Sequence, residues 1–272
     1  MARSTQPFLK WPGGKRWLVP YILEILDGRT MNRYIEPFLG GGAVFFGLCP
    51  QHALLSDVND DLINTYIQVR NSWPLLVNDL KRIPVDSETY QRMRESNPAC
   101  GLERAVRFLY LNRTAFAGMY RVDHRGRFNV PFGGGQRTPA PLWEKNLLKS
   151  ASSVLQGVSL LTSDFQPVID SAGDGDLVYC DPTYTVAHNN NGFVRYNEKN
   201  FSWRDQETLA RACHAAASRG AMVMVSNAFH RDIKLLYPNA ETRVLERWSG
   251  ISPVASKRRR AQEYLFVLDD RI

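Results

Sequence analysis

The pattern of apolar and polar positions predicts short strands that alternate with helices. Residues 15–26 place apolar side chains mostly at helical spacing, and residues 43–48 predict the start of a second helix. Brief apolar runs predict strands at 34–38, 53–56, 158–161, 177–180, 222–226 and 264–268, and a helix is predicted at about 204–219. The order of strand, glycine turn, helix and a second strand ending in an acid opens a doubly wound nucleotide-binding sheet. We therefore expect an α/β fold with a Rossmann-like sheet.

Residues from about 60 to 145 interrupt this alternation. Three segments in it have helical periodicity: 60–82, 87–94 and 102–113. A stretch rich in glycine and arginine follows at 118–130, and its turn residues between β-prone flanks predict a hairpin with a basic tip. We predict a catalytic domain made of residues 1–59 and 146–272, with residues 60–145 inserted as a helical and β-hairpin recognition domain.

Composition narrows the functional classes. The 272 residues carry a net charge of +7, which fits a polyanionic partner without identifying one. The four cysteines are widely spaced and the five histidines lack ligand spacing, so we predict neither a structural disulfide nor a metal site. No apolar run reaches the roughly 20 residues that cross a bilayer, and the first residues lack a secretory signal. These features lead us to expect a cytoplasmic protein without a membrane partner.

The chemistry is concentrated in the tetrapeptide Asp181-Pro182-Thr183-Tyr184, directly after an apolar strand. The carboxylate of Asp181 and the carbonyl of Pro182 could accept both hydrogens of an exocyclic amine such as that of adenine. Tyr184 could stack on a base that has left the duplex. Taken alone, an Asp-Pro pair after a strand is an ordinary turn.

A glycine-rich turn, Phe38 to Gly42, follows the first predicted strand and would let the backbone approach a cofactor closely. Asp57 ends the next strand, where an acid can accept both hydroxyls of a ribose. The sequence has no GxxxxGK[ST] loop, which argues against a nucleoside triphosphate site.

In this combination the chain resembles the DNA adenine methylase (Dam-type) family, the α-group of N6-adenine-specific DNA methyltransferases. The segments that carry the resemblance occur in the family's order and run through nearly the whole chain: 8–15, 36–42, 56–59, 108–113, 126–133 and 181–184. The resemblance implies a site-specific enzyme that transfers a methyl group from S-adenosyl-L-methionine to adenine N6 in double-stranded DNA. The product would be S-adenosyl-L-homocysteine. The family's usual target implies methylation within GATC after base flipping.

The resemblance also implies site residues. The catalytic set is Asp181, Pro182 and Tyr184. The cofactor set is Trp11, Lys15, Phe38, Gly40, Asp57, Asp164, Phe165 and Asp181. The set that faces DNA is Lys10, Arg113, Phe116, Met119, Arg121, Arg125, Asn129 and Pro131. Within that last set, Phe116 would fill the space left by the flipped base, and Arg121 would read a guanine edge.

Two departures from the family pattern keep alternatives open. Thr183 stands where the family usually has a second proline, which restores a backbone N–H and frees φ. Ala117 replaces a residue that is commonly polar. The alternatives are a catalytically impaired DNA-binding protein of the same fold and a cytosine-N4 methyltransferase. Glutamine or RNA methylation is disfavoured, because those enzymes typically begin the tetrapeptide with Asn. We expect a monomer. A partner nuclease, as in restriction-modification, is open, and so is an orphan or phage-borne role without such a nuclease.

Overall fold

The chain folds as two compact units. The first comprises residues 1–29, 39–51 and 57–162, and the second comprises residues 30–38, 52–56 and 163–272. The structure, a computed structural model, describes residues 5–123, 126–134, 145–185, 201–248 and 260–270. The predicted boundary between a catalytic and a recognition domain stays a prediction.

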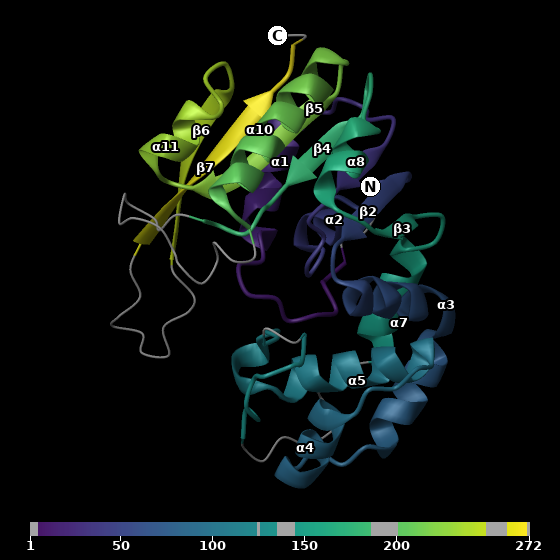
Figure 1. Ribbon diagram of the computed structural model, residues 1–272. Coiled ribbons are helices and arrows are strands. Elements are labelled where there is room, and N and C mark those ends of the chain that lie inside the picture. The colour runs from purple at the N-terminus through teal and green to yellow at the C-terminus, as the bar shows by residue number, and fades with distance from the viewer. Residues whose placement is uncertain (1–4, 124–125, 135–144, 186–200, 249–259, 271–272) are drawn as a thin grey trace. The chain divides into compact units, whose positions relative to one another are not determined.

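Seven strands form one sheet in the order β3-β2-β1-β4-β5-β7-β6 (Figure 1). Their bounds are β1 Tyr34–Glu36, β2 Ala53–Asp57, β3 Ser159–Thr162, β4 Leu177–Cys180, β5 Met222–Ala228, β6 Glu241–Trp248 and β7 Arg260–Leu268. Strands β2, β1, β4 and β5 pair in parallel, whereas β7 pairs antiparallel with both β5 and β6. The order is that of a doubly wound sheet up to β5, which places the ligand-binding edge at the carboxyl ends of the parallel strands.

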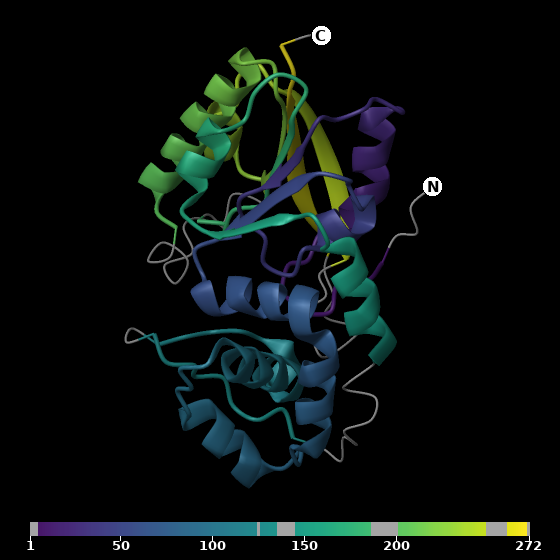
Figure 2. The same ribbon diagram turned by 90° about the vertical axis from the view of Figure 1, so that its right-hand side faces the viewer.

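The core of the second unit lies between the sheet and the helices α8 (Phe165–Asp170) and α10 (Trp203–Ser218). Both views show these helices on one face of the sheet (Figures 1 and 2). Every residue of β4 and β5 is buried, as expected for central strands covered on both faces. A capping box between Ser202 and Asp205 starts α10, and its alanine-rich buried face allows close packing on the strands. The short helix α11 (Arg231–Leu235) follows β5.

The first unit is largely helical. It contains η1 Arg16–Leu18, α1 Val19–Leu26, α2 Ala43–Leu48, α3 Asp60–Arg82, α4 Ser87–Glu95, α5 Gly101–Thr114, η2 Phe116–Gly118 and α7 Lys145–Val154. Asn59 caps α3 by accepting from the N–H of Leu62, and Asp86 caps α4 in the same way. Helix α3 packs against both α5 and α7.

A proline kinks α3 and creates a contact with α7. Pro74 has no N–H to give to the carbonyl of Arg70, and the backbone at Ser72 leaves helical geometry. The freed carbonyl accepts instead from Ser152 Oγ at 2.8 Å and from Gln156 Nε2 at 3.1 Å. The kink therefore leaves no unsatisfied carbonyl at this position and ties the two helices together.

The fold class predicted from the sequence is confirmed, α3 and β4 have the predicted bounds, and α2 starts at the predicted residue. Strand β6 was not predicted, because its charged and partly exposed residues lack a clear apolar alternation. The predicted hairpin at 118–130 is antiparallel but holds only isolated bridges, one of which joins Val122 and Phe128. Its predicted basic tip, Arg125, lies outside the described residues. Within the part of the chain that the structure describes, no helix is long and apolar enough to cross a membrane.

Candidate active site

The tetrapeptide lies at the edge of the second unit's sheet where the parallel strands end. Asp181 follows the last residue of β4, and Pro182 is buried while Thr183 is exposed. This edge, next to the point where the strand order reverses between β1 and β4, is where open α/β sheets bind ligands. The catalytic role of the tetrapeptide stays a prediction.

A serine on the neighbouring strand holds the carboxylate of Asp181. Ser226 Oγ of β5 donates to Asp181 Oδ1 at 2.7 Å, and Tyr179 of β4 lies 3.0 Å from the same serine oxygen. Ser226 and Tyr179 are each only 1% exposed. The acid is thus held by side chains from the sheet itself.

Tyr184 is anchored by the antiparallel strand β7. Its hydroxyl donates to Glu263 Oε2 at 2.9 Å, and Glu263 is buried. Burial, followed by the negative charges of Asp181 and Glu263, raises the pKa of Tyr184 well above its usual value. The tyrosine therefore stays protonated at neutral pH, and the hydrogen bond of its hydroxyl holds that end of the side chain in place.

A glutamine stabilises the loop that contains Thr183. The buried Gln206 of α10 donates from Nε2 to the carbonyl of Thr183 at 3.4 Å and to Thr185 Oγ1 at 3.2 Å. Asn227 of β5 donates to Gln206 Oε1 at 3.0 Å and fixes the orientation of its amide. Thr185 in turn donates to the carbonyl of Phe201. The loop thus has tertiary restraints that do not require a second proline.

Three aromatic rings gather in the second unit beside the tetrapeptide's strand. Phe165 stacks on Phe38 with ring centres 5.3 Å apart, and Phe201 packs at 5.7 Å from Phe165. Phe165 is buried, whereas Phe38 is partly exposed. Asp164 is exposed and caps α8 by accepting from the N–H of Gln166 at 3.0 Å. The cap is an ordinary structural role, so the predicted cofactor contact of Asp164 stays a prediction.

In the first unit the glycine turn packs against Trp11. A Cβ on Gly40 would lie 2.7 Å from Trp11 Nε1, and one on Gly41 would lie 2.7 Å from Trp11 Cβ. Gly42 has φ +64° and would place a Cβ 2.8 Å from the hydroxyl of Tyr66. Glycine is therefore required at these positions by the protein's own packing.

Asp57 is bound to this turn by backbone hydrogen bonds. Its Oδ2 accepts from the N–H of Gly40 and its Oδ1 from the N–H of Asn59, both at 3.0 Å. Burial raises the pKa of Asp57, while those backbone hydrogen bonds lower it in part. An ionised carboxylate has about four lone-pair positions, so Asp57 can accept further hydroxyl donors. Lys15 is buried, and its Nζ donates to the carbonyl of Gly13 at 3.1 Å.

Two residues of the predicted DNA-facing set are held by partly buried hydrogen bonds of the first unit. The backbone of Lys10 exchanges two hydrogen bonds with the side chain of the buried Asn112. Arg113 donates from Nη2 to the carbonyl of Phe8 at 2.6 Å. The backbone of Lys10 is therefore held in place while its side chain is exposed, whereas Arg113 is held through its guanidinium.

The remaining described members of that set lie on η2 and the hairpin. Phe116 is 52% exposed, and its predicted contact with DNA stays a prediction. Arg121 is exposed, and its Nε donates to Asn129 Oδ1 at 2.8 Å. Met119 is partly buried and Pro131 is exposed. Arg125 lies outside the described residues.

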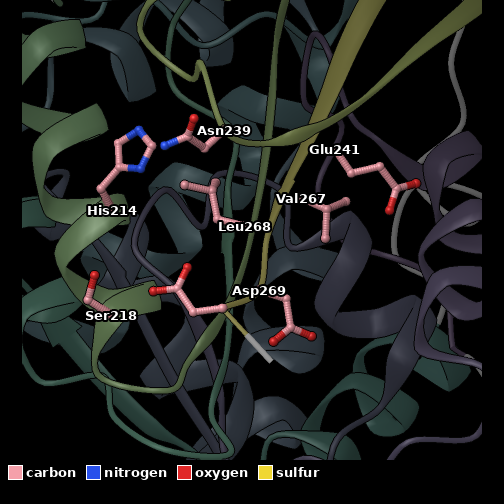
Figure 3. A pocket seen from close by; sticks show the side chains of 8 residues that line it. His214, Ser218, Asn239, Glu241, Val267, Leu268 and Asp269 are labelled. Carbon is pink, nitrogen blue, oxygen red and sulfur yellow. The ribbon is translucent and has the colours of Figure 1, made fainter. Parts of the chain in front are cut away.

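A cavity of about 390 Å³ lies at the opposite edge of the second unit's sheet. Figure 3 shows His214 and Ser218 of α10 facing the end of β7 at Leu268 and Asp269. Leu268 pairs with Val223 near the start of β5, so this cavity lies where the parallel strands begin. It is not part of the site around Asp181.

Sequence reasoning missed the residues that support the tetrapeptide. Tyr179 and Ser226 are polar residues inside strands that are mainly apolar, and this contrast was the available signal; Glu263 stands next to other polar residues of β7 and gave no such signal. The four cysteines are free thiols. Within the described ranges, no group of three His, Cys, Asp or Glu side chains is arranged to hold a metal ion.

The sheet order and the acid at its carboxyl edge define a Rossmann-like α/β fold with a site at the topological switch point. Residues 11–250 match the family described as D12 class N6 adenine-specific DNA methyltransferase. The chain belongs to this family, which confirms the resemblance and the enzyme class predicted from the sequence.

Individual relatives agree with the family. The chain is 36% identical over 235 residues to the type II methyltransferase M1.LlaDCHI of Lactococcus lactis subsp. cremoris, covering 83% of this chain and 82% of that protein. It is 30% identical over 270 residues to the DNA adenine methylase of Escherichia coli (strain K12), covering 97% of this chain and 95% of that one. The crystal structure of TrmN from Thermus thermophilus aligns with a TM-score of 0.40 and 13% identity, covering 93% of this chain and 48% of that chain; the fold assignment does not depend on it.

Proposed function

We propose that this chain transfers a methyl group from S-adenosyl-L-methionine to N6 of an adenine that is flipped out of duplex DNA. The observation that carries the proposal is the anchored tetrapeptide at the carboxyl edge of the sheet, in a chain of this family. Adenine in GATC is the proposed target, on the basis of the resemblance in the sequence.

The residues present fit the proposed cofactor. Asp57 is a carboxylate at the end of a strand with lone pairs left for hydroxyl groups, and Phe38 and Phe165 form a stacked aromatic pair. Asp181 adds a negative charge suited to a sulfonium. When bound, S-adenosyl-L-methionine supplies a methyl group on positively charged sulfur. Assigning Trp11 and the other predicted cofactor residues to it remains part of the proposal.

The chain's own residues would orient the amine. Asp181 accepts one N–H of the adenine amine and the Pro182 carbonyl accepts the other, which localises the nitrogen lone pair. The anchored Tyr184 offers its ring to the flipped base. S-adenosyl-L-methionine would supply the methyl group and leave as the neutral thioether S-adenosyl-L-homocysteine, and the amine proton that is displaced would pass to solvent. Positioning of this kind accounts for much of the rate in an in-line displacement.

The test is methylation of DNA in cells that express the protein, read by sequencing of modified bases. The unmodified chain should leave N6-methyladenine at one recurring site. Asp181→Ala should abolish the mark, because the amine loses its charged acceptor. Asp170→Ala is a matched control, since Asp170 is an exposed residue of α8 and should leave methylation intact.

Each other outcome overturns a defined part of the proposal. N4-methylcytosine would establish the cytosine alternative, and cofactor binding without any methylation would establish an impaired DNA-binding protein. A mark at a sequence other than GATC would overturn only the target assignment. Retention of the mark by Asp181→Ala would show that the active site is elsewhere.

The relatives include both a type II methyltransferase and DNA adenine methylases. We propose that the chain protects DNA from a nuclease that cuts the same site. DNA methylated by this protein should then resist a restriction enzyme of that specificity. Cleavage of the methylated DNA by every such enzyme would contradict the proposed protection.

A further inference from the structure

We infer that Tyr179 and Ser226 form a hydrogen-bonded relay that fixes the orientation of the Asp181 carboxylate, and that both are positioning residues for methyl transfer. The inference rests on the proposed function and deepens it. It concerns strand residues outside the tetrapeptide itself.

The direction of the relay follows from the number of protons available. An ionised carboxylate can only accept, so Ser226 donates its single hydroxyl proton to Asp181 Oδ1, 2.7 Å away. Ser226 Oγ can then only accept from the Tyr179 hydroxyl, 3.0 Å away. The Cys180 carbonyl, at 3.5 Å from Ser226 Oγ, is a weaker alternative acceptor. The chain of donors therefore runs from Tyr179 through Ser226 to Asp181.

Burial makes this relay difficult to replace with water. Ser226 and Tyr179 are each 1% exposed, and both lie within central strands whose other described residues are mainly apolar. A serine in such a strand costs free energy unless its hydroxyl is hydrogen-bonded. Because the strands β4 and β5 pair in parallel through Cys180 and Val225, the two hydroxyls are held at a constant separation beside the acid.

Burial and nearby negative charge keep the first donor, Tyr179, protonated. Burial, and then the negative charges of Asp181, Glu36 and Glu263, raise the pKa of Tyr179 well above its usual value, although its hydrogen bond with Ser226 lowers it in part. The phenol therefore remains a donor throughout the neutral range. Rotation of the Asp181 carboxylate would break its bond to Ser226 Oγ, so the relay restricts the direction in which the acid can accept an amine.

The experiment measures kcat for methyl transfer to duplex DNA by the full chain, together with cofactor and DNA dissociation constants. Ser226→Ala should lower kcat by roughly 10- to 100-fold, the range expected for one hydrogen bond to a charged group. Both dissociation constants should stay within about twofold, since the relay orients the acid and does not form the binding surface. Ser226→Thr keeps the hydroxyl and should restore most of the rate.

The double variant separates a relay from two unrelated packing effects. Tyr179→Phe should reduce kcat by a smaller factor, because Ser226 can still donate to Asp181. In the Ser226→Ala background Tyr179→Phe should have no further effect on kcat, since its acceptor is gone. Independent effects would multiply instead, and that result would overturn the relay.

A matched control is Tyr237→Phe. Tyr237 is also a fully buried tyrosine of the second unit, but its hydroxyl has no hydrogen-bond partner among the described residues. Removal of the Tyr237 hydroxyl should leave kcat unchanged. A full rate for both Ser226→Ala and Tyr179→Phe, with Asp181→Ala inactive, would overturn the relay alone. An unmodified chain that methylates no adenine would overturn the proposed function and the relay together. If Ser226→Ala fails to fold, Tyr179→Phe and Ser226→Thr decide the matter by the same criteria.

Discussion

The contact between Gly40 and Trp11 leads to a quantitative prediction for Gly40→Ala. An added Cβ would lie 2.7, 3.0 and 3.3 Å from three atoms of the indole ring, inside the roughly 3.5–4.0 Å at which carbon atoms pack. Overpacking of this kind costs about 1–3 kcal/mol. Gly40 also has φ +46°, and a left-handed conformation costs an L-residue about 1–2 kcal/mol. The free energy of unfolding should therefore fall by about 2–5 kcal/mol.

Trp11→Ala distinguishes the two contributions. In the Trp11→Ala background, Gly40→Ala should lower the free energy of unfolding by only about 1–2 kcal/mol, which is the backbone contribution. The double-mutant cycle should then show a coupling free energy of about 1–3 kcal/mol between the two positions. The assay is urea denaturation followed by far-ultraviolet circular dichroism, a signal that does not depend on tryptophan fluorescence.

Gly173→Ala serves as the control substitution. Gly173 has no atom within 4 Å of the added Cβ and lacks a left-handed φ, so alanine should be neutral or stabilise by up to about 1 kcal/mol. An equal cost of Gly40→Ala with and without Trp11 would refute the packing argument. If Gly40→Ala lowers the free energy of unfolding no more than Gly173→Ala does, the argument from the left-handed φ of Gly40 is refuted as well.

Two further predictions concern the first unit and use the same urea assay. Ala117→Gly should raise the free energy of unfolding by up to about 1 kcal/mol, because Ala117 is exposed and has φ +54°; a lower midpoint would contradict this. The pKa of Asp60 is lowered by hydrogen bonds from Arg104 first and then from Thr162. The ionised carboxylate of Asp60 therefore stabilises the folded state. This stabilisation is fully present above the ordinary pKa of 3.8 and is lost as the pH falls through the lower pKa of the folded state. Arg104→Gln should therefore lower the free energy of unfolding by about 0.3–1 kcal/mol at pH 7, a small value because solvent screens the pair. The difference between the variant and the unmodified chain should shrink below pH 4. A difference that grows on acidification would contradict the predicted sign.

Much of the fold was predictable because buried strands and amphipathic helices leave strong local patterns. Strand β4 was bounded correctly from an apolar run before Asp181 and Pro182, and the start of helix α2 was predicted correctly from the glycines before it. Strand β6 was missed, since it has only β7 as a strand neighbour in the sheet and its residues are mostly charged or polar. Its position depends on pairing with β7, which is a tertiary contact that no local pattern contains.

The site was predictable in part for the same reason. Asp181 and Tyr184 stand in a short contiguous motif, so they could be found without a structure. Glu263 lies 79 residues after Tyr184, and Ser226 lies 45 residues after Asp181. Their partners are set by which strands become neighbours in the sheet. A polar residue in a mainly apolar strand indicated that its side chain needed a hydrogen-bond partner, but the sequence did not identify that partner.

The reversed direction of β7 has a consequence for how the tetrapeptide is completed. Because β7 runs backwards, residues near its beginning, and not its end, reach the edge where β4 and β5 finish, with Glu263 opposite Ala228. Tyr184 thus gains this acceptor only after the final strand has been synthesised and has inserted between β5 and β6. A ribosome-bound chain that stops before residue 263 would contain the whole tetrapeptide and still lack the group that fixes its tyrosine.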